Sequence, residues 1–109
     1  AVLRGGGGNM STALQYVNAL RTRAYGNTSG NVTSINLDFI LDERARELAW
    51  EATRRTDLIR FGKFTSGSYL WPFKGGVQDG PAVEDYRKLY PIPTNDLIAN
   101  PNLVQNQGY

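Results

Sequence analysis

Hydrophobic residues recur at the spacing of an α-helix near the start of the chain. Asn9 or Ser11 can cap the amino end of this stretch, and Gly26 follows its last turn. The positions that would share one helix face are Ala13, Leu14, Val17, Leu20 and Ala24. The pattern predicts a helix at about residues 10–25.

A second, longer amphipathic pattern occupies residues 37–61. It passes through Thr53 and Thr56, where a bend is expected, and stops at Gly62, a residue type that often ends helices. Its apolar stripe consists of Leu37, Ile40, Leu41, Ala45, Leu48, Ala52, Leu58, Ile59 and Phe61. We predict one helix over residues 37–61, and a brief third helix at about 95–99 capped by Asn95.

Residues 63–94 show little periodicity. They include the segments "SYLWPFKGG" and "EDYRKLYPIP", which are compatible with short strands around residues 69–73 and 86–92. A run of about 30 residues without regular structure is uncommon in a compact domain, and it is usually functional or packs on something else. The predicted fold class is therefore mainly α, with a long, loop-rich C-terminal part.

Composition narrows the possible functions. The 109 residues fit one small domain, and no apolar run approaches the roughly 18 residues that a membrane span needs. Twelve basic and ten acidic residues give a net charge of +2, which is too balanced to predict nucleic-acid binding. Cysteine and histidine are absent, so the chain offers no thiolate nucleophile and no Cys/His zinc site. We predict neither a metal nor a cofactor.

Three carboxylates share one face of the predicted 37–61 helix. Glu43, Glu47 and Glu51 are spaced four residues apart, a pattern that could serve the acid–base chemistry of glycoside hydrolysis. Each, however, has an arginine three or four residues away, as in Glu43–Arg46 and Glu51–Arg55, and such a neighbour favours the ionised form. An ion-paired scaffold face is the better interpretation, and no catalytic residue is predicted.

The aromatic residues of the irregular stretch suggest a different kind of site. Tyr69, Trp71 and Phe73 alternate in a loop rich in glycine and proline. Exposed rings of this kind stack on sugar faces, with Lys74 or nearby amides available to the hydroxyl groups, whereas buried rings are core. The first interpretation makes Trp71 and Tyr69 the candidate ligand-binding residues. The second, simpler one packs Trp71-Pro72-Phe73 onto the 37–61 helix.

Two long motifs of the chain resemble the C-terminal region of the SusD/RagB family. They are "ILDERARELAWEATRRTDLIRFGKF" at residues 40–64 and "YPIPTNDLIANPNLVQNQGY" at residues 90–109. The opening "AVLRGGGGNMSTALQYVNALRTRA" is similar to the preceding helix pair of that family. Two departures are visible: Ala52-Thr53 stands where many members have Gly-His, and Gln107 where proline is usual.

The resemblance implies a surface-exposed lipoprotein of the outer membrane that binds oligosaccharides or polysaccharides. It also implies a partner, a SusC-like TonB-dependent transporter, to which the ligand is delivered, and a fold of tetratricopeptide-like helix pairs. We expect the chain to be a C-terminal fragment, residues 1–109 of which are mostly scaffold. The lipid anchor that attaches such proteins to the membrane would lie in the N-terminal part.

Two other functions remain open at this point. The first is a helical-repeat module that binds a protein partner through its exposed aromatic residues. The second is part of a carbohydrate-active hydrolase, which would require a carboxylate pair without arginine neighbours.

Overall fold

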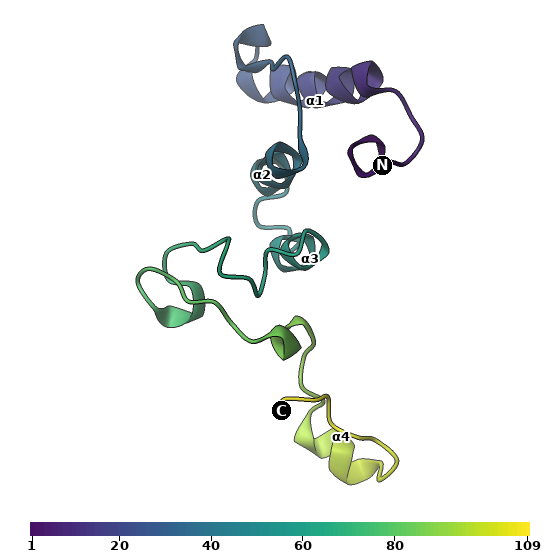
Figure 1. The fold of residues 1–109 in the computed structure, drawn as a ribbon, viewed down its shortest axis with the longest axis vertical. Coiled ribbons are helices and arrows are strands. Elements are labelled where there is room, and N and C mark those ends of the chain that lie inside the picture. The colour runs from purple at the N-terminus through teal and green to yellow at the C-terminus, as the bar shows by residue number, and fades with distance from the viewer. The chain divides into compact units, whose positions relative to one another are not determined.

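The chain is mainly α-helical and contains no β-strand (Figure 1). The structure, a computed structural model, describes residues 1–109 and divides into two compact units, Ala1–Ala49 and Trp50–Tyr109. Its α-helices are α1 (Met10–Tyr25), α2 (Leu37–Glu47), α3 (Arg54–Arg60) and α4 (Thr94–Ala99), with 3-10 turns at Val2–Arg4, Thr28–Gly30, Lys74–Gly76 and Asp85–Lys88. This confirms the predicted fold class. The prediction that Asn95 caps the last helix is wrong, because Asn95 lies inside α4 and the N-cap is Pro93. None of these helices has the length and apolar content needed to cross a membrane.

Capping residues set both ends of α1. The side-chain oxygen of Asn9 accepts hydrogen bonds from the backbone N–H groups of Ser11 and Thr12, at 2.7 and 3.3 Å. These bonds satisfy donors that a helix amino end otherwise leaves open. At the other end Gly26 adopts a left-handed conformation, with φ of 71°, which stops the helix. Val17 is the buried residue of α1, on the face that the periodicity indicated.

The prediction of one helix over residues 37–61 is wrong, because the structure separates α2 from α3. Trp50 and Ala52 have positive φ angles of 69° and 57°, a left-handed conformation that an α-helix cannot continue through. The hydrophobic pattern supplies a reason. In an unbroken helix Leu58 would lie about 100° around the axis from Leu41, yet both are buried in the structure. The break lets each short helix bury its own leucine.

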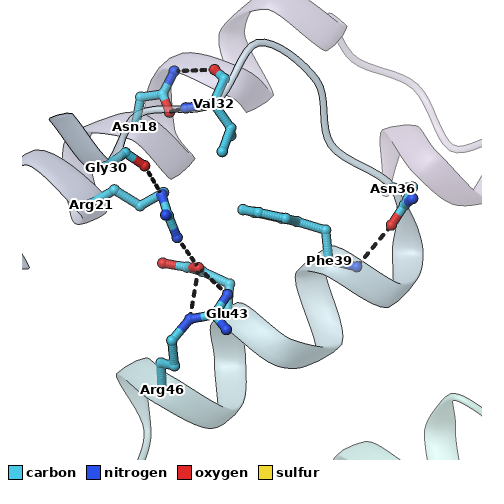
Figure 2. Close-up of polar contacts among 8 residues, drawn as sticks. All are labelled: Asn18, Arg21, Gly30, Val32, Asn36, Phe39, Glu43 and Arg46. Atoms are coloured by element: carbon cyan, nitrogen blue, oxygen red, sulfur yellow. Dashed lines mark hydrogen bonds and ion pairs between the residues drawn. The ribbon is translucent and has the colours of Figure 1, made fainter. Parts of the chain in front are cut away.

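Polar side chains hold α1, the following loop and α2 together in the first unit (Figure 2). The Asn18 side chain donates to the Val32 carbonyl oxygen and accepts from the Val32 N–H, both at 2.9 Å. Arg21 donates to the Gly30 carbonyl oxygen and, at 2.7 Å, to the Glu43 carboxylate. One arginine of α1 therefore contacts both the loop and α2.

Glu43 is the acceptor at the centre of this network. Its carboxylate also accepts a hydrogen bond from Arg46 Nη2, at 2.6 Å. This is the i,i+3 ion pair that the sequence predicted. Burial raises the pKa of the Glu43 carboxyl, but hydrogen bonds and charge from Arg46 and Arg21 outweigh it and hold the pKa below its usual value. Glu43 stays ionised and serves as a structural contact.

Glu43→Gln is expected to cost about 1 kcal/mol of stability at pH 7, because Gln still accepts a hydrogen bond but attracts neither arginine. A depressed pKa stabilises the fold above the unfolded value, near 4.3, and that stability is lost as pH falls through the folded value. The variant should therefore lose less stability than the parent between pH 6 and pH 3. Urea titrations across that range measure the difference. The exposed pair Glu84–Arg87 supplies the control: Arg87 also lowers the pKa of the Glu84 carboxyl, but water screens this pair, so Glu84→Gln should change the acid sensitivity less. Equal acid sensitivity of parent and Glu43→Gln would contradict the assignment.

Side chains of the C-terminal tail take the place of a β-ladder in the second unit. Gln105 accepts from the Ile92 N–H at 2.8 Å and donates to the Ile92 carbonyl oxygen at 2.9 Å. Asn106 donates to the Tyr90 carbonyl oxygen at 2.8 Å, and the Tyr109 hydroxyl donates to the Leu89 carbonyl oxygen at the same distance. These bonds pair backbone groups of Leu89, Tyr90 and Ile92 with side chains of the tail. The strand considered around residues 86–92 is therefore absent, as is the one at 69–73.

Candidate ligand-binding pocket

A pocket of about 310 Å³ lies in the second unit, between α3 and the segment that follows it. Tyr69 and Trp71, the two residues predicted to contact a ligand, both line it. The remaining lining residues are Arg54, Arg55, Leu58 and Phe64. The sequence pattern assigned none of these four to a site, because it placed Arg54, Arg55 and Leu58 in the scaffold helix and Phe64 just after its end at Gly62.

Tyr69 and Trp71 present their rings at an angle to each other. The ring centroids are 6.0 Å apart and the planes are inclined by 54°. Arg54 orients the first ring: its Nη2 donates to the Tyr69 hydroxyl at 2.5 Å, and its Cζ lies 5.7 Å from the ring centroid. Both tyrosine and tryptophan side chains are half-buried, so they contribute walls to the pocket and retain exposed surface.

Lys74 contacts Trp71 through its charged end. Its Nζ lies 4.6 Å from the centroid of the Trp71 ring and has no hydrogen-bond partner, and the residue is only 4% exposed. Burial lowers the pKa of the Lys74 ammonium group. The suggestion that Lys74 would reach sugar hydroxyl groups is not supported by this burial. Its contact with the ring positions Trp71 by a cation–π interaction.

The neighbouring Phe73 is 70% exposed and does not act as a plug for the loop. It has a left-handed backbone, with φ of 62°, and its N–H donates to the Gln78 carbonyl oxygen at 3.2 Å. The loop is thus closed by its own backbone bonds and by Trp71. Packing of the whole Trp71-Pro72-Phe73 segment onto a helix is not what the structure shows.

Arg55 was assigned to an ion pair with Glu51, and this assignment is wrong. Glu51 lies in the turn before α3 and is exposed, so the two are no longer one helical turn apart. Arg55 instead donates from Nη2 to the carbonyl oxygens of Arg87 and Lys88, at 2.7 and 3.1 Å. Its Cζ lies 4.0 Å from the Tyr90 ring centroid and 5.0 Å from that of Phe64. All these contacts are with carbonyl groups and rings.

The carboxylates considered for hydrolysis lie elsewhere. Glu43 and Glu47 belong to the first unit, where they form ion pairs with Arg21 and Arg23, and no carboxylate lines the pocket. A glycosidase of the usual kind needs two carboxyl groups flanking one bond. The structure also contains no group of three or more residues suited to holding a metal ion. The pocket is suited to binding by ring stacking and by donation from arginine.

These features define a helical scaffold with a loop-rich half that carries an arginine and aromatic pocket. The SusD family profile matches residues 4–109, and the chain belongs to this family. It is 43% identical over 109 residues to the starch-binding protein SusD of Bacteroides thetaiotaomicron, an alignment that covers 100% of this chain and 19% of that protein. It is also 32% identical over 108 residues to the SusD-like protein P25 of Formosa agariphila, covering 91% of this chain and 20% of the relative. The chain thus spans about one fifth of the length of these curated relatives.

Proposed function

We propose that this chain is the C-terminal part of a cell-surface oligosaccharide-binding protein. The observation that supports this most directly is the 43% identity, along the entire chain, to a protein named for starch binding. The pocket adds a physical argument, because two aromatic walls and arginine donors match the apolar faces and hydroxyl groups of a sugar. In this proposal the chain binds and contributes no catalysis.

Exposed apolar side chains support a role as part of a larger scaffold. The buried hydrophobic residues are Val17, Leu41 and Leu58, whereas many large hydrophobic side chains are more than half exposed, among them Tyr16, Trp50, Ile98 and Val104. Apolar surface of this extent usually marks contacts with other protein. We propose that these side chains pack against the remaining four fifths of a SusD-like protein.

The proposal includes a location and a partner. The protein would be held at the outer membrane by a lipid anchor in its N-terminal part and would pass its ligand to a SusC-like TonB-dependent transporter. Membership of the SusD family supports both parts of the proposal. Copurification from solubilised outer membranes, with a tag on the full-length protein, tests the partner: a stoichiometric transporter-sized subunit supports the proposal.

The binding function is tested by isothermal titration of the full-length protein with maltoheptaose. Cellohexaose, which has a different glucose linkage and is one residue shorter, serves as the control glycan. We expect saturable binding of the α-linked chain and at least tenfold weaker binding of the control. Failure to bind any soluble oligosaccharide, together with retention of a protein partner, would instead favour the helical-repeat interaction module.

A further inference from the structure

We propose that the pocket in the second unit binds an acidic sugar residue, one that carries a carboxylate or a sulfate ester. The proposal rests on the glycan-binding function above and adds a chemical class of ligand at a defined place. The shared chemistry is a negatively charged oxygen group attached to a sugar ring. The lining residues, the charges around them and the pocket's size each support it.

The charged side chains of the pocket are all positive. Arg54 and Arg55 line it, and no acidic residue does. Two lysines add to this charge from beside the aromatic walls: Lys63 Nζ lies 5.9 Å from the Tyr69 ring centroid, and Lys74 Nζ lies 4.6 Å from that of Trp71. These cations favour an anion beside the rings, although the buried carboxylate of Asp57 in α3 offsets part of their charge and the chain's net charge is only +2.

Arg55 supplies the N–H groups that would bind the anionic group of the sugar. It is half-buried, and its contacts reach two backbone carbonyl groups and two rings but no carboxylate. Most partly buried charges in proteins are paired, because desolvation penalises an isolated one. Nη2 makes both of its backbone bonds, which leaves the other N–H groups of the fork for a ligand. Guanidinium groups match carboxylate and sulfate oxygens in geometry.

The size and the walls fit one sugar ring. At about 310 Å³ the pocket lies at the lower end of the range, roughly 300–1,000 Å³, that small-molecule sites occupy. The inclined rings of Tyr69 and Trp71 offer apolar faces for the C–H side of a pyranose, and Leu58 and Phe64 close the apolar wall. One acidic residue of a glycan chain would stack here while its anionic group meets the arginines.

The test compares two trisaccharides that share their sugar backbone and differ at C6, where one has a carboxylate and the other a hydroxymethyl group. Trigalacturonate and α-1,4-galactotriose are titrated calorimetrically into the full-length protein at 50 mM salt. We expect the acidic trisaccharide to bind at least tenfold more tightly, and the advantage to shrink at 300 mM salt as the charges are screened. A sulfated galactan trisaccharide forms the third arm and separates preference for a sulfate from preference for a carboxylate.

Single-residue variants test whether the acidic sugar binds in this pocket. Arg55→Gln should abolish the preference for the acidic trisaccharide, Arg55→Lys should retain part of it, and Trp71→Ala should weaken both ligands. One control should change nothing: Arg23→Gln, which removes a positive charge in the other unit. If Arg55→Gln fails to fold, Trp71→Ala and the salt dependence decide the matter.

Equal affinity for the charged and neutral trisaccharides would overturn the inference, as would a preference that survives both Arg55→Gln and Trp71→Ala. In either case Arg55 would be only a clamp on the 87–90 segment. A protein that binds maltoheptaose but shows no such preference refutes this inference and leaves the proposed function intact. A protein that binds no glycan refutes both.

Discussion

Leu41→Ala is expected to lower the free energy of unfolding by about 2–5 kcal/mol, the range seen when a buried leucine leaves a cavity. Leu41 is only 1% exposed and is the buried residue of α2. It is one of three buried hydrophobic residues in the whole chain, so little other packing can compensate. Chemical denaturation of the parent and the variant, followed by circular dichroism, gives the difference directly.

Leu48→Ala is the matched control for this experiment. The hydrophobic stripe placed Leu48 beside Leu41, but the structure puts Leu48 at the C-cap of α2, where it is half-buried. Partial burial removes less apolar surface from water, so we expect a loss of about 1 kcal/mol. Equal losses in the two variants would mean that Leu48 is packed as tightly as Leu41, although α2 ends at Glu47.

Local signals in the sequence were sufficient to identify the helices but not the break between α2 and α3. Asn9 and Gly26 specify the ends of α1 through bonds and backbone angles that involve only neighbouring residues. The break depends on Trp50 and Ala52 adopting left-handed angles, which neither residue type favours by itself. Such angles persist only where surrounding packing requires them, and packing between distant residues is not visible in periodicity.

The same distinction explains what could be inferred about the pocket. Tyr69 and Trp71 stood out because alternating aromatic residues in a glycine-rich loop are unusual, and both do line it. Arg55 could not be found this way. Its relevant contacts are with Arg87, Lys88 and Tyr90, more than 30 residues away in the chain. A signal was nevertheless present, since the family resemblance covered both the α3 segment and the "YPIP" segment.

The loop that presents Trp71 depends on Gly80. Gly80 is buried and has φ of 70°, and an added Cβ would overlap the carbonyl oxygen of Trp71 and lie 3.0 Å from the Cβ of Lys74. That carbonyl accepts the Lys74 N–H at 3.1 Å and so forms the turn that brings the lysine to the ring. Because the overlap is with backbone, rotation of a side chain cannot relieve it.

Gly80→Ala is therefore expected to destabilise the fold by roughly 2–4 kcal/mol, from left-handed strain plus displacement of the Trp71 backbone. Gly76→Ala separates the two effects. Gly76 lies in the same loop with nearly the same angle, φ of 78°, but a Cβ added there would meet nothing within 4 Å, so only the strain of about 1 kcal/mol remains. Thermal melts of both variants give the stabilities.

Calorimetric titration of the full-length variants should show weaker glycan binding for Gly80→Ala and unchanged binding for Gly76→Ala. If Gly80→Ala were as stable as Gly76→Ala and bound glycan like the parent, the loop would not be what positions Trp71.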